Sequence, residues 1–165
     1  MSPPWIRPAI SADLPAVGAI YAHAVHTSTA TFDVEQPPLS SWQSKLDSTA
    51  VGDHFLVAHD DDTILGYAYS GAFRNRPAYR PTRQTSVYLC PQARGSGLGS
   101  RLYGELIDLL RHDDVHLVVA VVAQPNLPSN ALHAKLGFTD VGTLDEVGFK
   151  FGAYVSTTAF QLRLS

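Results

Sequence analysis

The chain has 165 residues, a formal net charge of -3 at pH 7, 45% hydrophobic residues and 16% charged residues. Such a composition is typical of a globular protein that buries roughly 68–70% of the surface of its unfolded chain, and it excludes a disordered or fibrous protein. The mildly acidic balance argues against a protein whose whole surface binds nucleic acid. We therefore expect a single domain over residues 1–165 and no nucleic-acid partner.

Hydropathy and cysteine content indicate the compartment. No apolar run approaches the ~20 residues of a membrane span, and Met1-Ser2-Pro3-Pro4-Trp5 lacks the basic region and apolar core of a signal peptide. The single cysteine, Cys90, has no partner in the chain for a disulfide bond, which fits a reducing environment. We expect a cytoplasmic protein that does not act at a membrane.

The first third of the chain predicts a strand, two helices and a long loop. Residues 5–7 are typical of a short strand, and apolar residues at helical spacing predict a helix that begins at Ser11-Ala12-Asp13 and ends near His26. Residues 27–38 contain β-branched residues and two prolines, which favour a loop, and a second helix is expected over 39–46. A loop of this length is often functional.

The remainder of the chain alternates strands and helices. Apolar stretches at 55–58 and 64–69 flank the acidic turn Asp60-Asp61-Asp62 and predict a hairpin. The later elements are a strand at 85–89, a helix over 102–110, a nearly continuous apolar strand at 116–123 covered on both faces, a helix at 129–136 capped by Gly137, and strands at 138–146 and 154–164. We expect a mixed, twisted sheet with helices on both faces.

A glycine-rich segment, Arg94-Gly95-Ser96-Gly97-Leu98-Gly99, lies between a predicted strand and a predicted amphipathic helix. Backbone N–H groups at such a turn have no partner inside the helix, and the helix dipole adds partial positive charge, so the turn can bind phosphates. Gly97 and Gly99 allow close approach of a ligand, and Arg94 can add a charge-assisted contact. The spacing differs from a Walker loop and from a dinucleotide fingerprint. Taken alone, the pattern would equally suit a flexible loop.

The spacing Arg-x-x-Gly-x-Gly resembles the pyrophosphate loop of GNAT acetyltransferases. Nearly the whole chain is similar to the phosphinothricin and methionine sulfoximine N-acetyltransferase family within that superfamily. The resemblance implies an α/β fold of the α+β type, with about six to seven strands in a mixed twisted sheet and helices on both faces. The matching stretches are Ala12–Val17, Thr29–Phe32, Phe73–Pro77, Tyr79-Arg80, Ser86–Tyr88, the glycine-rich loop, Asn126 with Ser129, His133–Phe138 and Glu146–Gly152.

What the resemblance implies is an enzyme that transfers the acetyl group of acetyl-CoA to the amine of a small amino acid or amino-acid analogue. The transfer would occur by direct attack in a ternary complex, with acetyl-CoA as co-substrate and no metal. The resemblance also implies a homodimer. The implied cofactor-binding residues are Val87, Tyr88, Leu89, Arg94, Gly95, Ser96, Gly97, Leu98, Gly99, Ser100, Asn126 and Ser129.

The implied acceptor-binding residues are Phe32, Arg74, Arg76 and Tyr79, because a guanidinium fork suits a carboxylate or phosphinate. Without the resemblance, the two arginines would equally suit a solvated loop. His133 stands where many superfamily members carry a tyrosine acid, and a histidine can protonate a leaving thiolate. The alternative is a histidine on the helix surface with no chemical role.

One position departs from the family. Its general base is a glutamate just before the Ser-Val-Tyr motif, whereas this chain has Gln84, which can orient an amine or a water but cannot accept the proton. Three explanations stay open: another base acts, with Glu35 first and His133 second; the acceptor is a weakly basic arylamine or hydrazine; or the protein binds acyl-CoA and turns over poorly. Tyr154 and Ser156 stand where the family has a tryptophan and an acid, so the pocket can differ in size or charge.

Overall fold

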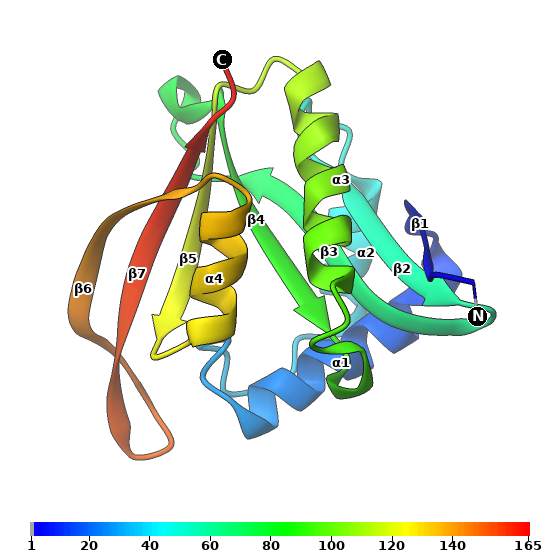
Figure 1. Cartoon of the computed structure of the whole chain (residues 1–165), viewed down its shortest axis with the longest axis horizontal. Coiled ribbons are helices and arrows are strands. Elements are labelled where there is room, and N and C mark those ends of the chain that lie inside the picture. Colours follow the sequence, from blue (N-terminus) through cyan, green and yellow to red (C-terminus); the bar gives the residue numbers. More distant parts are fainter. Residues whose placement is uncertain (1) are drawn as a thin grey trace.

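A computed structural model describes residues 2–165, which form one seven-stranded sheet with two helices against each face (Figure 1). The strand order is β1-β2-β3-β4-β5-β7-β6, and every neighbouring pair is antiparallel except β4 and β5. The mixed sheet expected from the sequence is confirmed. The elements are β1 (Trp5–Pro8), α1 (Leu14–Thr27), α2 (Leu39–Asp47), β2 (Phe55–Asp60), β3 (Thr63–Ala72), β4 (Thr82–Leu89), α3 (Leu98–His112), β5 (Leu117–Gln124), α4 (Leu127–Lys135), β6 (Thr139–Lys150) and β7 (Ala153–Arg163).

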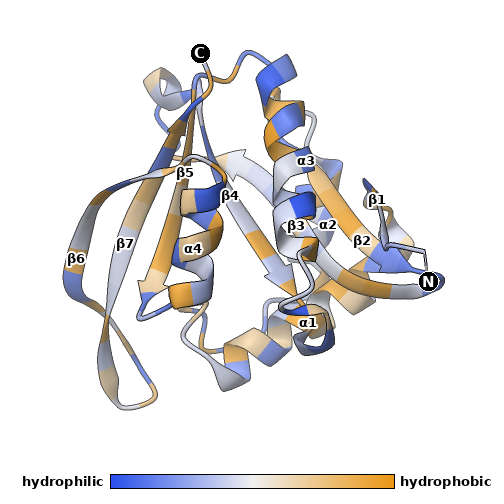
Figure 2. Ribbon diagram, viewed as in Figure 1, coloured by the Kyte–Doolittle hydropathy of each residue, from blue (hydrophilic) through white to orange (hydrophobic). Residues whose placement is uncertain are grey.

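Two hydrophobic clusters hold the helices to the sheet. On one face, α3 packs its apolar side against β2, β3 and β5, and Leu132 of α4 and Leu136, which follows α4, pack at the margin of this cluster. On the other face, α1 and α2 pack on β2 and β3 around the buried Trp42. Hydrophobic residues run along β2 and β5, as this arrangement requires (Figure 2). None of the helices within residues 2–165 has the length and apolar character needed to cross a membrane.

The start of α1 is anchored to β1 by a buried carboxylate. Asp13 accepts hydrogen bonds from the Arg7 guanidinium at 2.7 and 2.9 Å and from the backbone N–H of Ile10 at 2.9 Å. The Arg7 contact holds the pKa of Asp13 below its ordinary value. A short 3-10 turn over Ser11–Asp13 precedes α1, so the predicted helix start is displaced by one turn.

One expectation about the sheet was wrong. The apolar run of β5 suggested a strand covered on both faces, but Val121 is 49% exposed. Its side chain borders an open groove, because β4 turns away from β5 beside it. Two strands are also longer than expected: β4 begins at Thr82, and β6 continues through a bulge to Lys150.

We predict that Leu106→Ala in α3 lowers the free energy of unfolding by about 2–5 kcal/mol, because a fully buried leucine leaves a cavity. Leu109→Ala in the same helix is the control, since Leu109 is 38% exposed and its loss should change stability by no more than about 0.5 kcal/mol. Urea denaturation measures both. Equal losses for the two variants would contradict the packing described for α3.

Candidate active site

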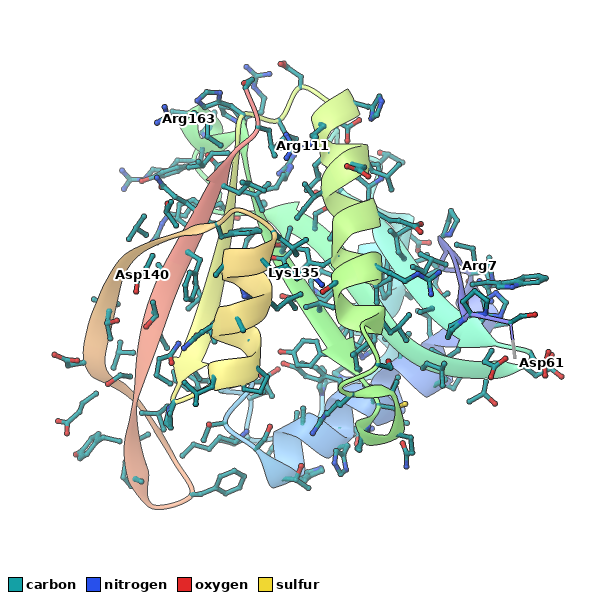
Figure 3. All side chains as sticks on the ribbon, viewed as in Figure 1. Arg7, Asp61, Arg111, Lys135, Asp140 and Arg163 are labelled. Atoms are coloured by element: carbon teal, nitrogen blue, oxygen red, sulfur yellow. The ribbon has the colours of Figure 1, made fainter. Side chains whose placement is uncertain are left out.

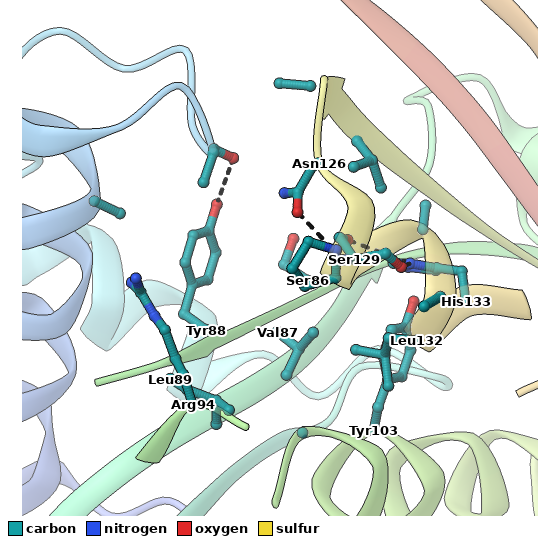
Figure 4. Close-up of a pocket in the computed structure, with 18 of the residues that line it drawn as sticks. Ser86, Val87, Tyr88, Leu89, Arg94, Tyr103, Asn126, Ser129, Leu132 and His133 are labelled. Atoms are coloured by element: carbon teal, nitrogen blue, oxygen red, sulfur yellow. Dashed lines mark hydrogen bonds between the residues drawn. The ribbon is translucent and has the colours of Figure 1, made fainter. Parts of the chain in front are cut away.

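A groove opens where β4 and β5 separate. These strands pair only through Thr82–Gln84 and Leu117–Val119, and each then continues with its other neighbour, β3 or β7. The groove has a volume of about 770 Å³ and lies between residues 85–89 of β4, residues 120–123 of β5, α4, the glycine-rich loop and Ser28–Ala30 (Figure 4). Beyond Gln84, the β4 backbone groups that face β5 are free to bind a ligand.

The glycine-rich loop forms one end of the groove. Gly95 and Gly97 adopt left-handed φ angles of 75° and 83°, which glycine adopts without strain, and Gly97 is the N-cap of α3. The first N–H groups of α3 therefore point out of the helix toward the groove, where its dipole favours an anion. Arg94, Gly95, Gly97, Gly99 and Ser100 line the groove, which suits the pyrophosphate of a coenzyme A group.

Two of the predicted cofactor residues, Ser96 and Leu98, do not line the groove but stabilise the glycine-rich loop. The Ser96 hydroxyl donates a hydrogen bond to the carbonyl of Ala93 at 2.5 Å, and the Leu98 side chain is buried in the core beneath α3. Leu98 belongs to the helical series Leu98, Leu102, Leu106, whose spacing indicates a core position. Val87, Tyr88 and Leu89 of β4, which are also predicted cofactor residues, line the groove.

Asn126 and Ser129 lie at the start of α4, on the opposite wall from Tyr88 (Figure 4). The Asn126 side-chain oxygen accepts a hydrogen bond from the Ser129 N–H at 3.2 Å, so it caps α4. Both residues line the groove. The N-terminal end of α4 therefore also borders the groove.

His133, one turn further along α4, lines the inner end of the groove with only 3% of its surface exposed. Its Nδ1 lies 2.7 Å from the Ser129 carbonyl oxygen, which can only accept, so Nδ1 carries the proton and Nε2 can accept one. The ring packs between Phe160 and Tyr103. Burial lowers the pKa of His133, partly opposed by the Ser129 hydrogen bond. The lowered pKa keeps the ring neutral and makes Nε2 a weaker base than a free imidazole, so Nε2 can donate a proton only after it has taken one up.

The predicted acceptor residues lie apart from this groove. Strand alternation puts Gln84 on the same face of β4 as Tyr88, the face toward α1, while Thr85 points toward α3. Glu35 and Phe32 are exposed in the loop between α1 and α2. Arg74, Arg76 and Tyr79 are exposed in the segment that joins β3 to β4. The structure thus brings His133 together with the cofactor residues, whereas the predicted acceptor residues, Glu35 and Gln84 are not among the residues that line the groove.

Sequence reasoning missed a set of buried tyrosines. Tyr103 of α3 lines the groove, and its hydroxyl lies 2.5 Å from that of Thr85. Tyr21, Tyr67 and Tyr69 pack with Tyr88 on the side of the sheet that faces α1, which is also the side of Gln84. We call this side of β4 its acceptor face. Burial raises the pKa of all these phenols, which stay neutral hydrogen-bonding groups. The sequence did contain one signal for this cluster: Tyr67 and Tyr69 lie two residues apart in a predicted strand, so their side chains share one face of the sheet.

A groove between two separating strands, with a glycine-rich loop and a helix N-terminus at one end, is the arrangement expected from the resemblance to acetyl-CoA-dependent acetyltransferases. The model of the acetyltransferase (GNAT) family matches residues 19–138. The chain belongs to this family, whose members are N-acetyltransferases.

Its relatives include a phosphinothricin N-acetyltransferase of Streptomyces coelicolor, 42% identical over 155 residues that cover 90% of each chain. A second is an L-methionine sulfoximine/L-methionine sulfone acetyltransferase of Pseudomonas paraeruginosa, 39% identical over 161 residues that cover 96% of this chain and 94% of the relative. The structure of yncA from Salmonella typhimurium with its cofactor acetyl-CoA has a TM-score of 0.95 at 34% identity, over 99% of this chain and 95% of that one. These relatives confirm the resemblance found in the sequence, and acetyl-CoA is the cofactor in the solved homologue.

We predict that Arg94→Gln weakens binding of coenzyme A about tenfold, because a charge-assisted contact beside the helix end is lost. Arg111→Gln is the control, since Arg111 projects from the opposite end of α3 (Figure 3). Calorimetric titration measures both affinities. Equal losses of affinity in the two variants would mean that the overall charge of the protein, and not the loop, attracts coenzyme A. We also expect Arg94→Gln to have a smaller effect at high salt, because salt screens the charge of Arg94.

Proposed function

We propose that this chain transfers the acetyl group of acetyl-CoA to the amine of a small amino acid or amino-acid analogue of the phosphinothricin or methionine sulfoximine type. The observation that carries the proposal is the continuous groove from the α3 N-terminus to His133 and to the loop after α1. It suits a long cofactor whose thioester ends beside the acceptor face of β4. The acceptor class is supported by the substrates named for the two relatives above.

Direct attack in a ternary complex requires the protein to hold the cofactor, to polarise the thioester carbonyl and to remove a proton from the amine. A bond forms between the amine nitrogen and the acetyl carbon, the carbon–sulfur bond breaks, and the amine loses a proton while the thiolate leaves. When bound, the thioester supplies an activated acetyl carbonyl. The unpaired backbone N–H groups of β4 donate hydrogen bonds toward that carbonyl, while the glycine-rich loop and Arg94 hold the pyrophosphate.

The amine proton needs an acceptor other than Gln84, whose amide has no basic atom. Glu35 is our first candidate because it offers an exposed carboxylate in the loop that borders the groove. His133 is the second, since its Nε2 is unprotonated. In this arrangement Gln84 orients the amine, and Phe32, Arg74, Arg76 and Tyr79 contact the acceptor.

A second acceptor class is favoured by one observation, the amide of Gln84 at the base position. An arylamine is already neutral at pH 7 and a hydrazine is less basic than an aliphatic amine, so either acceptor depends more on orientation and less on deprotonation. A protein that binds acyl-CoA without efficient turnover is the third candidate. Activity on a panel of acceptors separates the three.

We expect thiol release from acetyl-CoA with L-phosphinothricin, L-methionine sulfoximine or L-methionine sulfone, and little with arylamines. Gln84→Glu should raise turnover of these amino acids at least about tenfold at neutral pH, because a carboxylate restores a general base. Gln43→Glu in α2 is the control for added charge. Product masses identify the acetylated amine. If Gln84→Glu gains nothing, Glu35 or a changed acceptor geometry takes precedence, and cofactor binding without turnover would contradict the proposal.

We also propose that the protein is a homodimer and that β6 contributes to the interface. β6 is the edge strand of the sheet, and its outer groups lie open along twelve residues. An edge strand with exposed apolar side chains is normally covered by another chain. The exposed apolar residues are Val141, Leu144, Val147 and Phe149 of β6, Phe151 in the turn that follows it, and Tyr154 of β7.

We predict that Leu144→Glu shifts the protein from dimer to monomer, because it adds a charge to this surface. Val51→Glu is the control, as Val51 is equally exposed but lies between α2 and β2. Sedimentation analysis gives both masses. A wild-type protein that sediments only as monomer would rule out the homodimer.

A further inference from the structure

The tip of the hairpin formed by β6 and β7 lies at the same end of the molecule as the loop after α1 and contacts this loop (Figure 1). A β-bulge redirects its tip, because the register of β6 shifts between Leu144 and Gly148 and Glu146 adopts a left-handed φ of 53°. The Ser156 hydroxyl stabilises the bulge by accepting a hydrogen bond from the Glu146 N–H at 2.9 Å. The residues beyond the bulge are the ones that contact the loop.

Lys150 is the principal contact. Its ammonium donates hydrogen bonds to the carbonyl oxygens of Ser28 and Thr31, each at 2.8 Å, and only 4% of the residue is exposed. Within residues 2–165, no carboxylate lies within ion-pair distance of it. Burial lowers the pKa of Lys150, partly opposed by Asp33. A buried ammonium is costly unless it is well coordinated, so the two carbonyls are what keep it in place.

Gly148 makes the second contact. A Cβ built at Gly148 would lie 2.3 Å from Cε2 of Phe32, so the phenyl ring occupies the space that the glycine leaves. The backbone of Gly148 is not in the left-handed region, so an alanine there would cause no backbone strain. Its effect would come from the contact of its Cβ with the Phe32 ring. Phe32 is one of the residues proposed to contact the acceptor.

The same loop is held from its other side by α1 and β4. The Tyr21 hydroxyl lies 2.6 Å from the Thr31 hydroxyl and donates to Asp33, and the Tyr88 hydroxyl donates to the Ala30 carbonyl at 3.4 Å. Ser28, Thr29 and Ala30 form part of the groove wall. The segment 28–33 is therefore fastened to the β1–β4 half of the sheet by tyrosines and to the β5–β7 half by Lys150.

We propose that Lys150 and Gly148 are positioning residues for the acceptor: by holding segment 28–33 across the gap between β4 and β5, they set the width and shape of the acceptor end of the groove. The hairpin thereby couples the edge of the sheet to acceptor recognition, while the cofactor loop at the other end is independent of it. The identity of the acceptor rests on the proposed function, whereas the coupling itself does not.

Lys150→Met removes the donors while keeping the length and apolar stem of the side chain. We expect the KM for the acceptor to rise about tenfold or more, with the Kd of coenzyme A and kcat within about twofold of wild type. Amide hydrogen exchange at residues 28–33 should become faster while that of α3 is unchanged. Lys150→Arg, which retains the donors, should recover part of both effects.

Gly148→Ala is a separate test of whether the hairpin sets the shape of the acceptor end of the groove. It is the deciding variant if Lys150→Met does not fold. We expect displacement of the Phe32 ring to change the ratio of kcat/KM values between a small and a larger acceptor. Gly104→Ala in α3 is the matched control, because a Cβ there has no atom within 4 Å and Gly104 is not among the residues that line the groove.

Unchanged exchange at 28–33 together with unchanged acceptor selectivity in folded variants would overturn the inference. A general loss of thermal stability with cofactor and acceptor binding weakened alike would also overturn it, since that is the result of a purely structural contact. If wild-type protein acetylates none of the acceptors, the proposed function fails, and hydrogen exchange in the Lys150 and Gly148 variants still tests the coupling.

Discussion

β4 and β5 share hydrogen bonds along only three residue pairs, and the site depends on what happens after the third. Each strand is already stabilised on its far side, β4 by β3 and β5 by β7, so the two can separate without losing their place in the sheet. The separation leaves backbone donors and acceptors of β4 unpaired at the centre of the protein. Such groups need a partner, and an extended ligand with amide and carbonyl groups can supply it.

The charge distribution follows from this geometry. Helix α3 begins at the glycine-rich loop, so its first N–H groups and Arg94 make that end of the groove suitable for phosphates. The inner end is different, because burial among aromatic rings keeps His133 and the tyrosines neutral. The proposed anion-binding end and the neutral, buried end that contains His133 thus lie apart in a single groove.

The hairpin of β6 and β7 connects the two halves that the gap divides. Its apolar outer surface is available to a second copy of the chain, and its buried Lys150 holds the loop that closes the groove. Association of two chains and the shape of the acceptor end would then depend on the same element. This arrangement gives the protein a structural reason to keep a long, bulged strand at the edge of its sheet.

Local patterns in the sequence determined most of the elements and the phosphate end of the groove. Helical spacing, alternation and glycines act over a few residues, so Gly97, the strand before it and the helix after it could be recognised together. The prediction that both faces of β5 are covered was wrong at Val121. The pattern of apolar residues predicts that a segment is a strand, but it does not predict whether the neighbouring strand stays paired with it. Only the tertiary structure decided where Gln84, Glu35 and His133 lie relative to one another. The contact of Lys150 with Ser28 joins residues 122 positions apart, and no local preference encodes it, since it forms only when the sheet brings both ends of the chain to the same groove.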